Sequence, residues 1–132
     1  MLKNKVQNAQ LAALFALAGV VSAPPALAQS YDERGCRTLV HGCAQARSRW
    51  DEDSDTVTIT TVTNRCGERI AIRLCKETEN NGSSKWICHN YGLSDGESID
   101  QTTFFSTGEY EFDYIGSRSS ATDSACLGSR RN

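Results

Sequence analysis

The chain has 132 residues, with 14 basic against 16 acidic side chains and a formal net charge of −2 at neutral pH. A length of about 130 residues predicts one domain and excludes large multidomain enzymes. The slightly acidic balance argues against nucleic-acid binding, which needs a basic surface. The hydrophobic fraction of 39% is too high for wholesale disorder.

Residues 1–28 have the pattern of a secretory signal peptide. Two lysines precede an apolar stretch at 11–23, and small residues occupy the −3 and −1 positions before Gln29. The alternative is a membrane anchor, but a spanning helix needs about 18 apolar residues and the proline pair at 24–25 interrupts this stretch. We therefore expect a single mature domain at 29–132, secreted or periplasmic and of bacterial type, with no membrane span.

All six cysteines lie in the predicted mature part: Cys36, Cys43, Cys66, Cys75, Cys88 and Cys126. Six cysteines in a small exported domain indicate three disulfides. A structural zinc site needs closely spaced cysteine pairs or histidines, and the chain has only two histidines and no such pair. We expect no metal and no cofactor.

One disulfide can be predicted from local geometry. Asn81-Gly82 is the strongest short signal for a two-residue hairpin turn, because a type I′ turn needs positive φ at both central positions. Cys75 and Cys88 are equally distant from this turn, so they would stand opposite each other on two antiparallel strands. Two further expectations pair Cys36 with Cys43 in a local loop and Cys66 with Cys126.

Residues 36–50 show a helical spacing of apolar side chains. Leu39, Cys43, Ala46 and Trp50 recur at helix-face intervals, although Gly42 weakens the pattern. This spacing predicts one short N-terminal helix.

The remaining sequence alternates between apolar and polar residues and is rich in β-branched and aromatic side chains. Strands are expected at 56–63, 69–75, 85–91, 98–105 and 109–115. The predicted fold is mainly β: a small antiparallel β-sandwich or open barrel of about five strands with the short N-terminal helix, stapled by three disulfides.

The leading functional interpretation is an exported binding or interaction module. Its partner would be an envelope protein, a glycan or an enzyme to be inhibited, and the oligomeric state is left open. The residues expected to contact it are the aromatics Trp86, Tyr110 and Tyr114, with Arg69 and Arg73 as rim charges. Aromatic rows of this kind are more often plain core, which is the competing interpretation for the two tyrosines.

The alternative is a small secreted hydrolase, in particular a nuclease. His89 would act as acid or base with Glu97 or Glu109 as its counterpart, although no spacing forces these groups to converge. A purely structural envelope component is the third possibility. The acidic run at 51–55 lacks the glycine and glutamate of an EF-hand, so a solvated loop is favoured over a calcium site.

Overall fold

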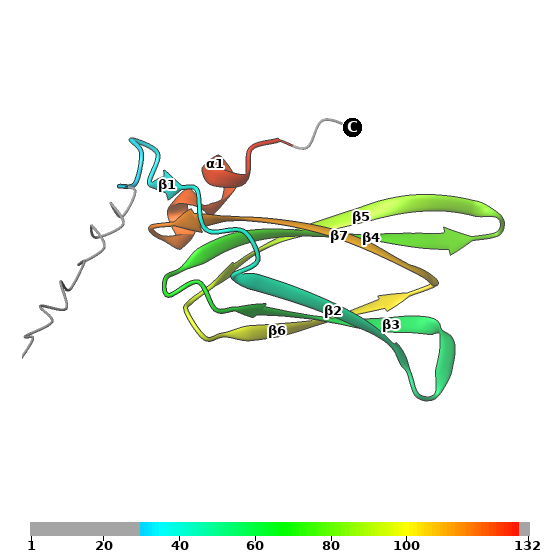
Figure 1. Ribbon diagram of the computed structural model, residues 1–132. Helices are drawn as coiled ribbons and strands as arrows, with labels where there is room; N and C mark the ends of the chain where they lie inside the picture. The colour runs from blue at the N-terminus through cyan, green and yellow to red at the C-terminus, as the bar shows by residue number, and fades with distance from the viewer. Residues whose placement is uncertain (1–29, 130–132) are drawn as a thin grey trace, which may run out of the picture.

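The computed structural model describes residues 30–129 as two antiparallel β-sheets and one C-terminal helical segment (Figure 1). The four-stranded sheet has the order β1 (Cys36–Arg37), β7 (Ser106–Ser117), β4 (Ile70–Asn80) and β5 (Ser83–Leu93). The three-stranded sheet has the order β2 (Ala44–Asp51), β3 (Ser54–Asn64) and β6 (Ser98–Phe104). A 3₁₀ turn, η1 (Ser120–Thr122), leads into helix α1 (Asp123–Leu127). The predicted leader and its cleavage site lie outside the described residues.

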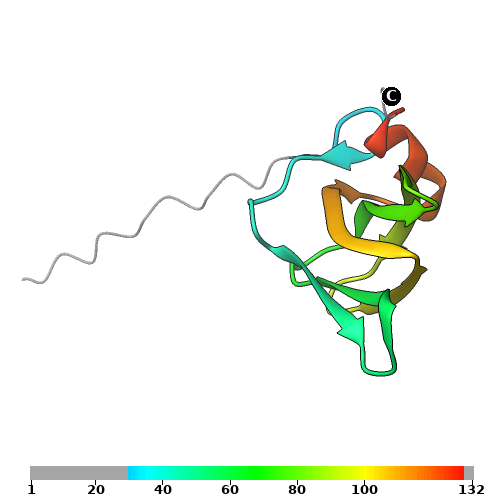
Figure 2. The ribbon, with the colours of Figure 1, turned by 90° about the vertical axis from the view of Figure 1, so that its right-hand side faces the viewer.

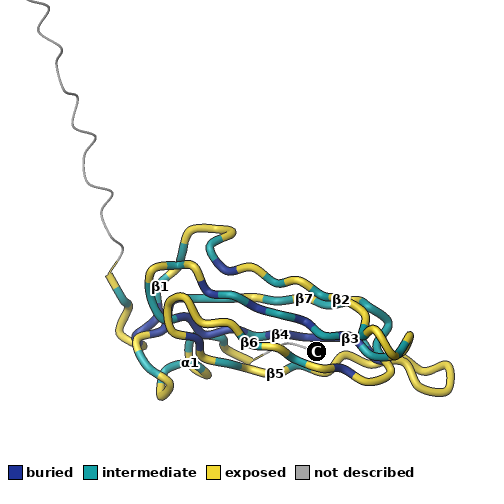
Figure 3. The backbone as a smooth tube through the Cα atoms, turned by 90° about the horizontal axis from the view of Figure 1, so that it is seen from below, coloured by how far each residue is buried: buried dark blue, intermediate teal, exposed yellow. Residues whose placement is uncertain are grey.

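The two sheets face each other across a small apolar core. Its fully buried members come from both layers: Ala44, Val62, Ile70, Ile72, Leu74 and Leu93. Strand β4 is the most buried element and runs through the middle of the molecule (Figure 3). Because successive strand residues point to opposite faces, Ile70, Ile72 and Leu74 enter this core together. Strand β5 lies along the edge of its sheet and is mostly exposed.

The prediction of a mainly β protein with three disulfides is confirmed, but the predicted N-terminal helix is wrong. Residues 36–50 instead contain β1 and β2, and the helix is at the C-terminal end of the described chain. Gly42, with φ +87°, interrupts the segment just before β2. From Ala44 onward small inward residues alternate with Gln45, Arg47 and Arg49, which suits a strand paired along its whole length with β3.

The hairpin disulfide Cys75–Cys88 is confirmed, and the two cysteines are direct partners in the β4–β5 register. The other two predicted pairs, Cys36–Cys43 and Cys66–Cys126, are wrong. The structure forms Cys43–Cys66 and Cys36–Cys126.

Because residues 44–51 form strand β2 and not a helix, the cysteines pair differently from the prediction. Ala44 pairs with Asn64, so the residues just beyond this pair, Cys43 and Cys66, meet at the open end of the β2–β3 hairpin. Cys36 lies on β1 beside the end of β7, and α1 follows β7 and brings Cys126 back to it.

No helix in the described part of the chain is both long and apolar enough to cross a membrane. Three disulfides suggest an oxidising environment outside the cytoplasm.

Candidate functional site

A cleft of about 330 Å³ lies between the two sheets, on the side where β5 and β6 are edge strands and do not pair with each other. Its walls come from β4, β5, β6 and the connection from β6 to β7. Figure 2 views the molecule from the end that carries the β2–β3 and β4–β5 hairpins. The lining residues outside the connection are mostly polar: Lys76, Thr78, Asn80, Lys85, Ile87, His89, Gln101, Thr102, Thr103 and Phe104.

Lys76 forms the inner wall of this cleft. It continues the inward row of β4 after Leu74, and its residue surface is only 3% exposed. Its Nζ donates a hydrogen bond to the backbone oxygen of Gln101 at 3.2 Å. Burial lowers the pKa of Lys76 to about 8, because a low-dielectric surrounding disfavours the charged ammonium.

No carboxylate within residues 30–129 forms an ion pair with Lys76. The ion pairs Asp32–Arg34, Glu68–Arg37 and Asp123–Arg69 involve other residues. An ammonium has three donors, and Lys76 uses one of them on Gln101. The inner wall therefore carries a cation with unused hydrogen-bonding capacity.

Thr103 is the second polar group of the inner wall. It faces inward from β6, opposite Thr58 in the strand register, and is 7% exposed. Its Oγ1 is buried and has no hydrogen-bond partner among the described residues. The neighbouring Thr58 hydroxyl is already engaged, since it donates to Ser106 Oγ at 2.8 Å. Buried hydroxyls are normally hydrogen-bonded, so this group stands out.

The mouth of the cleft is apolar. Phe104 is 66% exposed and Phe105 is 56% exposed, and Ile87 on β5, which is 37% exposed, lines the same cleft. Phe105 also has φ +52°, a left-handed conformation that is unusual for a bulky side chain. Its backbone oxygen accepts a hydrogen bond from Glu79 N at 2.8 Å, which fixes the β6–β7 connection against the end of β4.

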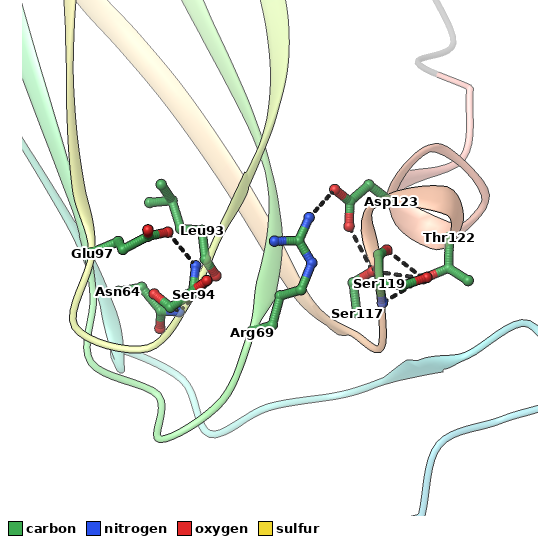
Figure 4. Close-up of polar contacts among 9 residues, drawn as sticks. All are labelled: Asn64, Arg69, Leu93, Ser94, Glu97, Ser117, Ser119, Thr122 and Asp123. Atoms are coloured by element: carbon green, nitrogen blue, oxygen red, sulfur yellow. Dashed lines mark hydrogen bonds and ion pairs between the residues drawn. The ribbon is translucent and has the colours of Figure 1, made fainter.

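Of the predicted catalytic residues, only His89 lines the cleft. Glu97 lies at the turn that joins β5 to β6, where its carboxylate accepts a hydrogen bond from Ser94 N at 2.6 Å (Figure 4). Glu109 is exposed on β7 and lies outside the cleft lining. The structure thus places His89 with Lys76 rather than with either glutamate.

The predicted contact aromatics do not share one surface. Tyr110 and Tyr114 face inward and pack against the core, where their hydroxyls donate to Ala46 O at 3.1 Å and Val40 O at 3.0 Å. Trp86 is half-exposed on the outer face of β5, on the same side as Cys88. The two tyrosines thus fasten the segment from 40 to 46 to β7.

Arg69 and Arg73 hold the C-terminal segment to the four-stranded sheet. Arg69 donates to Asp123 Oδ2 at 2.6 Å (Figure 4), and Arg73 hydrogen-bonds to Gly128 O. Gly92 lies directly under the Arg69–Asp123 pair, and any Cβ at this position would overlap both side chains. The two arginines are thus engaged within the molecule.

The acidic run 51–55 forms the exposed tip of the β2–β3 hairpin. Within residues 30–129 there is no group of three or more His, Cys, Asp or Glu side chains arranged to hold a metal ion.

Sequence reasoning missed Lys76, Thr103, Phe104 and Phe105 as site residues. One signal was available for Lys76: it is in phase with the inward row Ile70, Ile72 and Leu74. The convergence of β4 with β6 depends on the packing of two sheets, and strand periodicity alone does not encode it.

Comparisons with known proteins give no relative: no family model, no curated protein and no solved structure matches this chain significantly.

Proposed function

We propose that this protein is an exported binding module that takes its ligand in the cleft between β5 and β6. The observation that carries the proposal is the pair of exposed phenylalanines, Phe104 and Phe105, at the mouth of a cleft with a buried cation. Ligand sites usually combine apolar side chains with a few convergent polar groups, and this cleft combines exposed aromatic rings with a buried ammonium. Phe105 keeps its aromatic side chain in a strained backbone conformation that glycine would adopt at lower cost, which supports a role for the ring itself.

The ligand belongs to the envelope or to the medium. The predicted leader at 1–28 sends the chain out of the cytoplasm, to the periplasm or beyond. The three disulfides support this placement, and they stiffen a sheet pair whose core is small.

The hydrolase alternative has less support. A histidine acting as acid or base needs a partner within hydrogen-bond reach of the same substrate. His89 shares the cleft with Lys76 and Lys85, and Glu97 and Glu109 lie elsewhere.

The test uses the oxidised protein purified from the periplasm of an expression host. A panel of amphipathic small molecules, glycans and short peptides is screened by thermal shift, and the hits are measured by titration calorimetry. Phe105→Gly is the test variant, because glycine accepts φ +52° and the fold is retained. Val40→Ser is the matched control, since Val40 is 81% exposed and lies outside the cleft.

The proposal expects at least one ligand whose affinity falls about ten-fold or more in Phe105→Gly and is unchanged in Val40→Ser. Turnover of RNA or peptidoglycan that His89→Ala abolishes, with folding intact, would instead establish the hydrolase. A panel without any ligand that depends on Phe105 would also contradict the binding proposal.

A further inference from the structure

Two buried donors lie on the inner wall of the cleft, one from each sheet. Lys76 Nζ comes from β4 and makes a single hydrogen bond, to Gln101 O. Thr103 Oγ1 comes from β6 and has no partner among the described residues. Both residues are more than nine-tenths buried, so leaving a donor without a hydrogen bond costs free energy. A hydrogen bond to a ligand oxygen would remove that cost.

The charged side chains around these two donors favour a negatively charged ligand. The titratable side chains lining the cleft are Lys76, Lys85 and His89, and no acidic side chain of the described residues lines it. Beside Lys76, β7 contributes Tyr110, whose hydroxyl donates to Ala46 O, and the β6 residues that line the cleft, 101–104, do not titrate. An anionic group placed against Lys76 therefore meets no like charge.

We propose that the cleft binds a monocarboxylate with an apolar body. The carboxylate oxygens accept hydrogen bonds from Lys76 Nζ and Thr103 Oγ1, and the body lies against Phe104, Phe105 and Ile87 at the mouth. This assignment rests on the proposed binding function and names the chemical class of its ligand.

The donor set favours a carboxylate over a phosphate group. The cleft has one buried ammonium, that of Lys76, which neutralises the single negative charge of a carboxylate. Lys85 and His89 are exposed to solvent, so neither provides a second buried positive charge. The cleft contains no arginine, the side chain that most often recognises phosphate with paired hydrogen bonds. Its volume of about 330 Å³ is at the lower end of the range for small-molecule pockets, roughly 300–1,000 Å³, so the body is short.

The experiment measures the affinity of octanoate for the oxidised protein by titration calorimetry, with 1-octanol as the uncharged ligand of equal length. Lys76→Met removes the charge and keeps most of the length of the side chain. Thr103→Val removes the hydroxyl and keeps the shape. Arg49→Met is the control, because it removes a positive charge from an exposed position on β2 that lies outside the cleft.

We expect Lys76→Met to weaken octanoate binding about ten-fold or more, and Thr103→Val to weaken it about three- to ten-fold. Arg49→Met should change it by less than about three-fold, since exposed charges away from the cleft are screened. Octanoate affinity should also fall about ten-fold from about pH 7 to about pH 9, as Lys76 loses its proton, and His89→Gln should leave this dependence in place.

A second pair of ligands tests whether the bound carboxylate belongs to a free small acid or to the C-terminus of a peptide chain. A short peptide ending in leucine is compared with its C-terminal amide. A free peptide that binds more tightly than octanoate identifies a chain terminus as the source, and a peptide that does not bind identifies a free small acid.

The outcomes separate this inference from the proposed function. If octanol binds as well as octanoate and Lys76→Met changes neither, the carboxylate assignment is overturned while the cleft remains a binding site. If glycans or uncharged peptides bind through Phe105 and no carboxylate does, the carboxylate assignment is likewise overturned and the binding function stands. If nothing in either experiment binds through the cleft, both proposals fail.

Discussion

The ammonium of Lys76 on β4 lies 3.2 Å from the backbone oxygen of Gln101 on β6, and this hydrogen bond joins one sheet to the other along their open side. Lys76 occupies the position where the row Ile70, Ile72 and Leu74 would next place an apolar side chain. The fold thus keeps a charged group at the edge of its core, and this group faces the cleft.

The first prediction concerns how the free energy of unfolding depends on pH. Burial lowers the pKa of Lys76 to about 8 in the folded protein, against 10.5 for the exposed side chain, so the folded state binds fewer protons between these values. Stability should therefore rise from about pH 8 to about pH 9.5, by roughly 1–3 kcal/mol. Urea unfolding at several pH values measures this rise.

Lys76→Met is the control for the pH series. It should be more stable than the wild type at about pH 7, because it removes a buried charge without an ionic partner, and the rise above pH 8 should disappear. The series ends at about pH 9.5 because burial raises the pKa of Tyr91, and ionisation of that residue would oppose the trend. A rise of equal size in both proteins would show that Lys76 is not its source.

The second prediction compares two disulfides. Cys36–Cys126 joins residues 90 apart, whereas Cys75–Cys88 joins residues 13 apart within a hairpin. In the chain-entropy account a loop of about 100 residues is worth about 4.7 kcal/mol and one of about 15 residues about 3 kcal/mol. Replacing Cys36 and Cys126 by serine should therefore lower the free energy of unfolding more than replacing Cys75 and Cys88, by about 1.5 kcal/mol. Equal losses in urea unfolding of the two double variants would contradict this ordering.

The third prediction concerns Asn64, which is fully buried at the end of β3. Its Nδ2 donates to Leu93 O and Ser94 O, all three residues being drawn in Figure 4. The same Nδ2 also donates to Glu68 O, and its Oδ1 accepts from Cys66 N at 2.9 Å. One side chain thus holds the β3–β4 and β5–β6 connections together.

Asn64→Ala should destabilise the protein by about 2–4 kcal/mol, because it leaves several buried backbone groups without partners. Asn90→Ala is the matched control. Asn90 is exposed on β5 and makes one long hydrogen bond to Arg73, so its loss should cost less than about 1 kcal/mol. Chemical unfolding of both variants measures the difference, and a small loss at Asn64 would be inconsistent with the network.

The fourth prediction concerns export. Periplasmic expression of the full chain should yield a protein that begins at Gln29, since Ala28 and the small residue two positions earlier fit the cleavage pattern. Intact-mass measurement locates the new N-terminus and counts the disulfides. An uncleaved chain in the membrane fraction would favour the anchor alternative.

Period-2 patterns were sufficient to predict much of the β structure. The inward row of β4, the Asn81-Gly82 turn and the Cys75–Cys88 bridge follow from residues close together in sequence, and the structure has all three. Residues 44–51 were misread because small alanines fit a helical spacing as well as a strand alternation. The outward series Gln45, Arg47 and Arg49 was the distinguishing signal.

The candidate site was much less predictable. His89 was singled out for its chemistry, and it does line the cleft, but Lys76 lay just beyond the predicted end of its strand. Phe104 and Phe105 gain significance only because β6 forms the edge of the three-stranded sheet beside β5. Contacts between sheets depend on long-range packing, which a single sequence does not specify.

The most direct test of the account is to map where octanoate binds. The ¹⁵N–¹H spectrum of the labelled, oxidised protein is recorded while octanoate is added, and each amide is followed to saturation. We expect saturable shifts at Lys76, at 85–89 and at 101–105, which are lost in Lys76→Met and kept in Arg49→Met. Saturable shifts confined to another surface, or a spectrum that octanoate leaves unchanged, would contradict it.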